Sequence, residues 1–579
     1  MAITPLPANP NLENLKKRAK TLLKSVQAGD AQAAQQVGPY FGDPRAISLQ
    51  QAQLVIARSH GFSSWTRLKR HVEGARDEGA DQLANRFLDL VTVAYGSVPD
   101  FGPARFEQAR ELLTEHPEIA QDSIYTAAAI GDVAGIDHWL DQQPDLINKK
   151  GGFFGWEPLM YAAYGRLPGT STYAAGLRLL ERGADPDAYY MWGGQYKFTA
   201  LTGVFGQGEG GPVNQPEHPD YVAFARAMLE RGANPNDSQA AYNRSFEPDD
   251  TCLELLLEYG LSASDKNNWL LVEDDKLLPH PSDTLHFQLI SAIKRGFADR
   301  VSLLVAHGVD LNKPDETYDT RTKGKTPYQA ALLMGEGAIA SMLAEAGAEQ
   351  RDLSPEEAFQ VACMAGDLTE AQAILKRSGD DLPGLRRTDM LRDAARRGNR
   401  EALEVMIALG FDLNGLSGNS ALHEAVMSED VGIAELLLEA GADPTLRDLN
   451  YYATPMGYAL HMEDAAMIAL LDRCRMDIFT AAARGNLDQI RARLVEDPTR
   501  LDQRFADICP GDVVPENGWT TPLVFAVASD HPEAVRLLLE AGADMTVTDG
   551  KGGTVWSVAE AQAGDGVRAV LAEFQSREV

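Results

Sequence analysis

The sequence has 579 residues, 44% of them hydrophobic, and a formal net charge of −31 at pH 7. Because affinity for DNA or RNA depends on cationic contacts to phosphates, this charge argues against a nucleic-acid partner. No apolar run of about 18 residues could cross a membrane and no secretory signal opens the chain, so we expect a cytoplasmic protein without membrane association.

The four cysteines give no sign of a metal site. Cys252, Cys363, Cys474 and Cys509 lie far apart and form neither a Cys-x-x-Cys pair nor a Cys/His cluster. Structural zinc sites need such closely spaced ligands. The sequence therefore predicts no metal and no cofactor.

Residues 1–80 are expected to form a helical module that differs from the rest of the chain. Leucines follow Leu12 at helical spacing, and a second helix is expected from Ser48. The chain up to Glu73 has a charge of +6, whereas the remainder has −37. We interpret the module as a cap over the helices that follow. The alternatives are that it folds back onto the acidic remainder and regulates access to it, or that it docks onto anionic material through Lys16, Lys17, Arg18 and Lys20.

Residues 81–150 are predicted to be helical and to contain the first copy of a repeat. The stretch YTAAAIGDVAGIDHWL, Tyr125 to Leu140, combines alanines, a Gly-Asp turn, and Ile and Leu at helical spacing. This layout predicts two helices joined by a tight turn. It returns at Phe359–Leu375, Leu391–Ile407 and Phe479–Leu494.

A second recurring pattern marks the ends of helices. ELLLEAGADPTLRD, Glu435 to Asp448, returns as RLLLEAGADMTVTD, Arg536 to Asp549. The leucines pack one helix on its neighbour, the Gly takes the left-handed conformation that ends the helix, and the following Asp or Asn caps the turn. Looser copies occur at Leu177–Asp187, Ala227–Asp237, Leu253–Ser262, Ser302–Asn312, Ser341–Glu349 and Val405–Asn414.

Helix-opening motifs precede these endings. They start a helix at Glu-Pro, Thr-Pro or Ser-Ala, because a Pro there needs no N–H, and they occupy Gly155–Ala163, Gly324–Leu332, Gly418–Val426 and Gly518–Val527. Opener and ending together resemble the ankyrin-repeat family, whose period is about 33 residues. Residues 1–80 are similar to the helical segment on some long bacterial ankyrin-repeat proteins. The resemblance implies an all-α ankyrin-repeat solenoid that is more regular over 321–579.

Residues 151–320 depart from the regular period. Gly183 and Gly232 are 49 residues apart, against 31 for Gly410 and Gly441, so the turns within 186–275 contain insertions. Inserted ankyrin turns commonly form the binding side, although their aromatic residues could instead close over the helices. The residues expected to line a ligand site are Tyr189, Tyr190, Trp192, Tyr196, Phe198, Asn214, Gln215, Tyr242, Asn243, Phe246 and Trp269.

The same turns contain candidates for acid–base chemistry, which are Glu209, His218, Asp249 and Asp250. Asp249 and Asp250 also stand just before an apolar helix, where carboxylates commonly act as caps. A further acidic pair is Asp274 and Asp275. A Gly-x-Gly-x-x-Gly motif at 206–211 follows a helix and contains a Glu that would repel phosphate, so we expect no dinucleotide site.

We therefore expect a recognition scaffold whose concave face and inserted turns bind a protein partner or a small polar ligand. The alternative is an enzyme, a hydrolase or lyase on a small polar or glycan-like substrate, that uses the acid–base candidates. Convergence of those candidates on one cavity would favour the enzyme.

Overall fold

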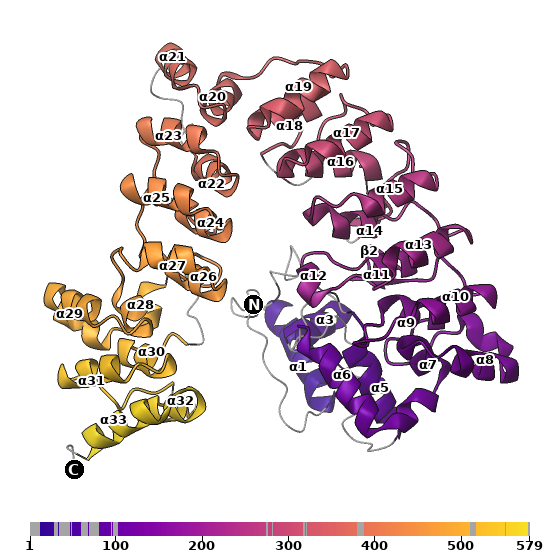
Figure 1. The fold of residues 1–579 in the computed structure, drawn as a ribbon, viewed down its shortest axis with the longest axis horizontal. Helices are drawn as coiled ribbons and strands as arrows, with labels where there is room; N and C mark the ends of the chain where they lie inside the picture. The colour runs from indigo at the N-terminus through magenta and orange to yellow at the C-terminus, as the bar shows by residue number, and fades with distance from the viewer. Residues whose placement is uncertain are drawn as a thin grey trace. The chain divides into compact units, whose positions relative to one another are not determined.

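The computed structural model describes most of the chain as two compact units (Figure 1). Residues 1–330 with 338–349 form unit 1, and residues 331–337 with 350–579 form unit 2. The described residues are 12–27, 33, 37, 47, 49–59, 68, 80–93, 95, 102–273, 276–280, 282–316, 319, 321–378, 387–509, 517–549 and 552–576.

Unit 1 contains helices and two short hairpins. Its first helices are α1 (Leu12–Gln27), α3 (Leu49–Ser59), α5 (Ala80–Val91) and α6 (Ala104–Glu115). Then follow η2 (Pro117–Gln121), α7 (Ile124–Ile130), α8 (Val133–Gln142), η3 (Pro144–Asn148), α9 (Pro158–Tyr164), α10 (Tyr173–Glu181), β1 (Tyr189–Trp192), β2 (Tyr196–Thr199), α11 (Ala200–Phe205), α12 (Gly211–Asn214), α13 (Tyr221–Leu229), α14 (Ser238–Asn243), η4 (Arg244–Phe246), α15 (Thr251–Glu258), β3 (Leu270–Glu273), β4 (Lys276–Pro279), α16 (Thr284–Arg295) and α17 (Ala298–Ala306).

Unit 2 consists of helices throughout its described residues. The division between the units falls at α18 (Pro327–Leu333) and α19 (Gly337–Glu345). Then follow α20 (Pro355–Met364), α21 (Leu368–Ser378), α22 (Thr388–Arg396), α23 (Arg400–Ala408), α24 (Ala421–Met427), α25 (Val431–Glu439), α26 (Pro455–His461), α27 (Ala465–Leu471), α28 (Ile478–Ala483), α29 (Leu487–Glu496), η5 (Pro498–Asp502), η6 (Phe505–Ile508), α30 (Pro522–Ala528), α31 (Pro532–Glu540), α32 (Val555–Gln562) and α33 (Asp565–Gln575).

Helices pack in successive pairs. α24 contacts its partner α25 and also α22 and α26, the first helices of the neighbouring pairs. The apolar faces of these helices form one continuous core in unit 2, in which Leu422, Ala425 and Leu437 are fully buried. The predicted all-α repeat fold is therefore confirmed in its coarse form.

The helix endings have the backbone geometry that the sequence predicts. After α25, Gly441 has a φ of +101°, and the next N–H, from Ala442, donates to the carbonyl of Leu437 at 2.9 Å. Such a left-handed residue closes a helix by satisfying its last carbonyls. Positive φ angles also occur at the other glycines of the ending motif, Gly183, Gly232, Gly260, Gly308, Gly347, Gly410 and Gly542.

Two β-hairpins differ from the expectation that the inserted turns contain no strands. β1 pairs with β2 and β3 pairs with β4, both antiparallel. The first hairpin turns at Gly193 and Gly194, whose φ angles of +60° and +77° suit a tight connection between strands. A Gly-Gly pair flanked by aromatic residues is itself a hairpin signal in the sequence.

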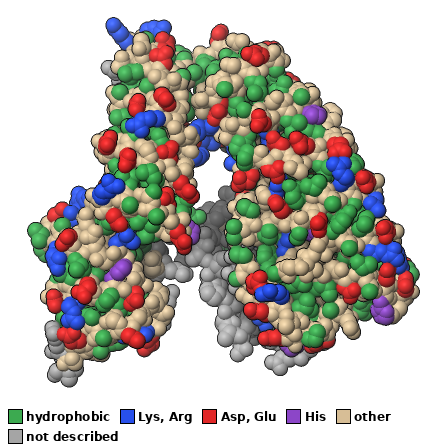
Figure 2. Space-filling view, viewed as in Figure 1, with side chains coloured by type: hydrophobic (Ala, Val, Ile, Leu, Met, Phe, Trp, Pro, Cys, Tyr) green, Lys and Arg blue, Asp and Glu red, His purple; other side chains and the backbone are tan. Residues whose placement is uncertain are grey.

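The N-terminal helices α1 and α3 contact each other and have their own small core, which includes Leu15, Val26 and Val55. On α1, Lys17, Arg18 and Lys20 are exposed, while Leu15 and Ala19 are buried. No described helix is long and apolar enough to span a membrane. Figure 2 shows Asp and Glu side chains spread over the surface that it displays, with Lys and Arg among them.

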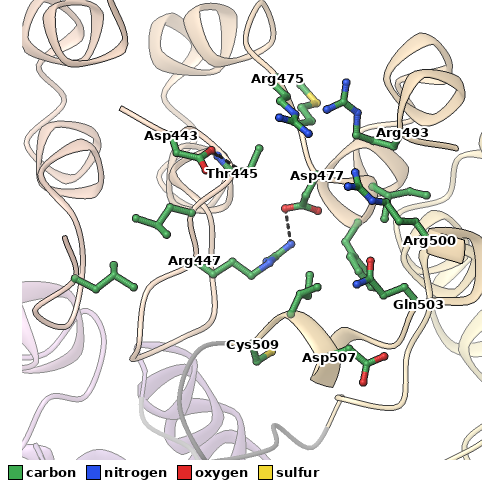
Figure 3. A pocket seen from close by; sticks show the side chains of 16 residues that line it. Asp443, Thr445, Arg447, Arg475, Asp477, Arg493, Arg500, Gln503, Asp507 and Cys509 are labelled. Carbon is green, nitrogen blue, oxygen red and sulfur yellow. Dashed lines mark hydrogen bonds and ion pairs between the residues drawn. The ribbon is translucent and has the colours of Figure 1, made fainter. Parts of the chain in front are cut away.

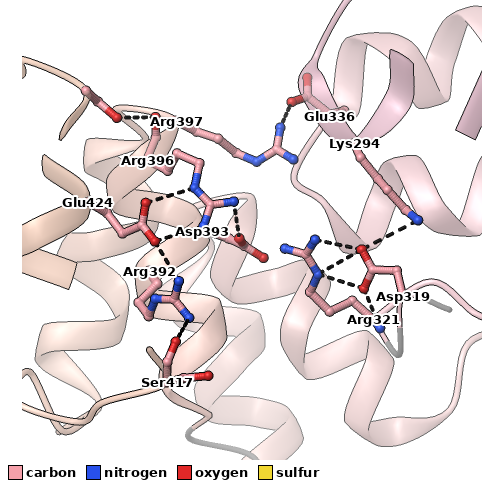
Figure 4. A network of polar contacts seen from close by, with 11 residues as sticks. Lys294, Asp319, Arg321, Glu336, Arg392, Asp393, Arg396, Arg397, Ser417 and Glu424 are labelled. Carbon is pink, nitrogen blue, oxygen red and sulfur yellow. Dashed lines mark hydrogen bonds and ion pairs between the residues drawn. The ribbon is translucent and has the colours of Figure 1, made fainter. Parts of the chain in front are cut away.

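A buried carboxylate links α22 to α24 in unit 2 (Figure 4). Glu424, only 2% exposed, contacts Arg392 at 2.6 Å and Arg396 at 2.9 Å. Burial by itself would raise the pKa of Glu424, but the hydrogen bonds from Arg396 and Arg392 outweigh it, so the pKa is lowered. In unit 1, Asp319 is held in a similar way by Arg321 at 2.7 Å and Lys294 at 3.5 Å.

We expect Gly441→Val to destabilise the protein by about 1–2 kcal/mol, because a β-branched residue is strained in the left-handed conformation. No heavy atom lies within 4 Å of a Cβ built at Gly441, so a clash would not contribute. Thermal unfolding measures the effect. The control is Gly432→Ala in α25, where φ is not positive and Ala favours the helix. Equal melting temperatures for the Gly441→Val variant and the native protein would contradict the assignment.

We expect Glu424→Gln to lower the free energy of unfolding by about 2–3 kcal/mol at neutral pH, because two arginines lose a charged acceptor. Since the pKa of Glu424 is lowered in the fold, its contribution is present above the ordinary glutamate pKa of about 4.3 and is lost as the pH falls through the lower folded value. Urea unfolding of both proteins at neutral and acidic pH tests this.

The control for this pH dependence is Glu404→Gln. Glu404 pairs with Arg400 on the exposed surface of α23, where an ion pair contributes less than about 1 kcal/mol. A stability difference between native protein and Glu424→Gln that stays constant down to strongly acidic pH would show that the buried carboxylate is not what the arginines stabilise.

Candidate functional site

The first hairpin presents aromatic side chains in the region where the sequence predicts a site. Along β1, Tyr190 and Trp192 lie on one face because successive strand residues alternate. Tyr190 stacks on Trp156 with ring centroids 4.6 Å apart and on Phe198 at 5.4 Å. Trp192 donates from Nε1 to the backbone oxygen of Tyr95 at 3.1 Å. These contacts fix the hairpin against the helices.

Beside the hairpin lies a cavity of about 380 Å³, which we call the aromatic pocket. Its walls come from β1, β2 and α14, from residues on either side of α12, from the segment before β3 and from the chain after α5. Most of the lining residues are among those that the sequence singled out. The lining consists of Tyr95, Trp192, Tyr196, Phe198, Glu209, Gln215, Gln239, Tyr242, Asn243 and Trp269.

Four of the six rings that line the aromatic pocket contact one another in a chain. Tyr196 and Tyr242 both meet the ring of Trp269 edge to face, with centroids 5.3 and 5.1 Å away. Trp192 is tilted against Tyr196 at 5.7 Å. Edge-to-face contacts hold aromatic rings in fixed orientations, so the walls are set before any ligand binds.

A short polar network closes the pocket around these rings. Asn243 donates from Nδ2 to the Tyr95 hydroxyl at 3.1 Å and accepts from Nε2 of Gln239 at 2.8 Å. At the exposed side, the Tyr242 hydroxyl donates to Oε1 of Glu209 at 2.7 Å. Burial raises the pKa of Tyr242 and the bond to Glu209 raises it further, so the phenol keeps its proton.

Two polar atoms in the pocket wall lack a hydrogen-bond partner among the described residues. They are Oε1 of Gln239 and Nε1 of Trp269, both inaccessible from the surface. The side chains of Gln239 and Trp269 are 4% and 8% exposed. An unpaired buried polar group costs about 1–3 kcal/mol. The pocket wall therefore contains one acceptor and one donor that have no protein partner among the described residues.

Several predicted ligand residues do not line the aromatic pocket. Tyr189 is 42% exposed, and Lys197 lies 4.7 Å from its ring centre. Asn214 donates to the backbone oxygen of Gly210 at 2.9 Å. Phe246 packs behind Tyr242. Tyr190 belongs to the stack beneath the hairpin, as described above.

His218, a candidate acid–base group, is fully buried away from the aromatic pocket. Its Nδ1 accepts the N–H of Asp220 at 3.0 Å, so Nε2 carries the proton and donates to the Thr172 hydroxyl at 2.9 Å. Burial lowers the pKa of His218 to about 3, with a further decrease from Arg166. A neutral imidazole in this position joins two loops, and the geometry gives it a structural role.

Asp249 and Asp250 form ion pairs at the start of α15 and do not line the aromatic pocket either. Asp249 pairs with Arg244 and accepts the N–H of Thr251 at 3.0 Å, which is the capping contact that the sequence suggested. Asp250 pairs with the buried Arg300. Of the four acid–base candidates only Glu209 lines the pocket, while Asp274 and Asp275 lie outside the described residues.

Sequence reasoning missed two residues of the lining, Tyr95 and Gln239. Tyr95 follows α5, far from the inserted turns, and its ring lies 4.7 Å from that of Phe198. Gln239 stands at the start of α14, four residues before Asn243 and three before Tyr242, on the same side of one helix. That helical spacing is a sequence signal that could have identified Gln239 as a lining residue. The sequence around Tyr95 contains no comparable signal.

Some of the helix pairs match models of known protein families. A model of three ankyrin repeats matches residues 359–448, and a model of a single ankyrin repeat matches residues 519–550. Both segments coincide with helix pairs of unit 2. The chain therefore contains ankyrin repeats.

Similar sequences include ankyrin repeat proteins of a virus and a bacterium. The chain is 32% identical over 127 residues to one from Fowlpox virus, and 25% identical over 154 residues to another from the same virus. It is 32% identical over 148 residues to an ankyrin repeat-containing protein of Treponema pallidum. The matches cover 20%, 26% and 25% of this chain and only 29%, 25% and 49% of those proteins.

We expect Asp250→Ala to destabilise the protein by about 3–5 kcal/mol, because Arg300 would remain as a buried charge without its carboxylate. Glu209→Gln should change stability by less than about 0.5 kcal/mol, since Glu209 is exposed. Urea unfolding distinguishes the two variants. If both were equally stable, Asp250 would not have the structural role that its ion pair indicates.

Proposed function

We propose that this protein is a recognition scaffold whose aromatic pocket captures a basic side chain of a protein partner. Ankyrin repeats generally mediate protein–protein interactions. The pocket would supply an anchor within such an interface, because large aromatic side chains in a desolvated pocket contribute most to binding. The unpaired Gln239 Oε1 in the wall is the observation that carries the proposal.

The chemistry of the aromatic pocket favours a cation with N–H donors. Rings of Trp192, Tyr196, Tyr242 and Trp269 attract a cation through their faces. An arginine or lysine side chain would donate to Oε1 of Gln239, and its charge would be balanced by Glu209 at the exposed side. A backbone carbonyl of the same partner could accept from Nε1 of Trp269.

The charge of the whole chain supports the same choice of partner. At −31 the protein attracts basic partners over distances up to the Debye length of about 8 Å at physiological salt. The carboxylate of Glu209 then favours a positively charged side chain at short range. Net charge and local lining therefore act in the same direction.

Recognition fits the pocket better than catalysis does. General acid–base chemistry needs positioned proton-transfer groups with pKa values near the working pH. Around the aromatic pocket, the raised pKa of Tyr242 keeps its proton in place, and His218, Asp249 and Asp250 are engaged elsewhere. We therefore propose no reaction for this site.

The test uses two probes of nearly equal shape, N-acetyl-arginine amide and N-acetyl-citrulline amide. Only the first is charged. Calorimetric titration of the full chain should show binding of the arginine probe and at least about tenfold weaker binding of the citrulline probe, because the cation–π and carboxylate contacts both need the charge. Equal affinity for the two probes, or no binding of either, would contradict the proposal.

Variants then locate the binding site. Trp192→Ala and Tyr242→Ala should each lower the affinity for the arginine probe at least about tenfold while the fold persists. Glu209→Gln should lower this affinity by a smaller factor. Tyr189→Ala is the matched control on the same hairpin, because Tyr189 is exposed and does not line the pocket. Leu437→Ala should instead cost about 2–5 kcal/mol of stability and leave binding intact. If the two pocket variants unfold as readily as Leu437→Ala, the aromatic residues are core.

A further inference from the structure

Unit 2 contains a second cavity, of about 460 Å³, whose chemistry is opposite to that of the aromatic pocket (Figure 3). It is lined by α28, α29, η5 and the turns around them, and we call it the arginine pocket. Four of the lining residues are Arg447, Arg475, Arg493 and Arg500. Figure 3 shows the guanidinium groups of Arg475, Arg493 and Arg500 gathered at one end of it.

The three gathered arginines share one carboxylate. Glu496 contacts Arg493 at 2.9 Å, Arg475 at 3.1 Å and Arg500 at 3.5 Å. Asp497 adds one longer contact, 3.6 Å, to Arg500. Three positive charges thus face two negative ones, and like charges this close repel one another unless an anion joins them.

The acidic residues in the lining are occupied by other donors. Asp443 accepts the N–H of Thr445 at 2.8 Å, and Asp507 accepts the N–H of Arg504 at 3.1 Å. Asp477 accepts the N–H of Thr480 at 2.8 Å, and also binds Arg447 at 2.8 Å. These carboxylates hold turns and helix starts, and within the described residues none of them forms an ion pair with Arg475, Arg493 or Arg500.

Arg493 supplies the observation that points to a ligand. It is only 7% exposed, and its Nε and Nη1 atoms are buried with no hydrogen-bond partner among the described residues. Arg447 is 8% exposed, and its Nε atom is likewise buried with no hydrogen-bond partner among the described residues. A guanidinium has five N–H donors in fixed directions, and burying several of them unpaired is costly. The wall of the arginine pocket therefore presents donors that lack an acceptor.

The shape of the arginine pocket defines the anion further. Arg475, Arg493 and Arg500 come from a turn, from α29 and from η5, so their donors approach from different sides. A tetrahedral oxyanion accepts from several directions, whereas a carboxylate accepts in one plane. The cavity also has room beyond the arginines, beside the apolar side chains of Leu416, Leu446 and Ile508.

The geometry points to a binding site for an organic phosphate, with the phosphoryl group on Arg475, Arg493 and Arg500 and its organic part against the apolar lining. This site is independent of the proposed recognition role, because it lies in the other unit and has different chemistry. It is a site for an anion in a protein whose net charge is −31, so the local arrangement of arginines must overcome the overall charge.

Calorimetric titration of the full chain at low salt tests the site with phenyl phosphate, inorganic phosphate and acetate as probes. We expect phenyl phosphate to bind more tightly than inorganic phosphate, and acetate to bind at least about tenfold more weakly than either. Tighter binding of inorganic phosphate would overturn the organic part of the proposal. Absence of phosphate binding, or acetate binding as tightly, would overturn it entirely.

Two substitutions assign the binding to the arginine pocket. Arg475 is exposed, so its substitution should not disturb folding. Arg475→Gln should weaken the binding of phenyl phosphate at least about tenfold. Arg493→Gln should do the same, and thermal unfolding checks its fold. The control is Arg491→Gln, which removes an exposed charge from the same helix outside the lining. Equal losses for Arg491→Gln and Arg475→Gln would mean diffuse attraction to positive charge, and would overturn the site.

Discussion

The packing of each helix pair on its neighbours is the interaction on which the rest of the structure depends. A single pair cannot bury its apolar face, so each gains stability only from the pairs before and after it. In unit 2 this produces one continuous core, in which Leu422 of α24 and Leu437 of α25 are fully buried. The glycines that follow many of the second helices, such as Gly441 after α25, help the stacking because they reverse the chain within a few residues.

Because the helices form the core, the turns between them can vary in length and sequence. Helices carry the core, so residues inserted between them do not disturb it as long as their own apolar surface is covered. The first hairpin meets that condition through Tyr190, which stacks on Trp156 and Phe198. Trp192, two residues later on the same face, then contributes to a pocket wall. One strand thus both attaches the insertion and builds the site.

The two pockets show how local arrangement dominates over net charge. The aromatic pocket is lined by rings and Glu209, which suits the proposed cation, whereas in the arginine pocket three guanidinium groups share Glu496, which suits the proposed anion. Both are lined by residues of turns and of helices, and both have buried polar atoms without partners in the described structure. Because screened charges act only over short distances, an acidic chain can contain both kinds of site.

The sequence by itself determined the repeat, the all-α class and the chain reversals, because helix spacing and left-handed glycines are local properties. It also located most of the aromatic pocket, since Trp192, Tyr196 and Tyr242 stand in conspicuous insertions. The tertiary structure alone decided which polar residues meet. In the sequence, His218, Asp249 and Asp250 are acid–base candidates just as Glu209 is. In the structure, however, His218 is buried and the two aspartates form ion pairs away from the pocket. Tyr95 and the gathered arginines come together from separate elements, and contacts between elements depend on packing that no local pattern encodes.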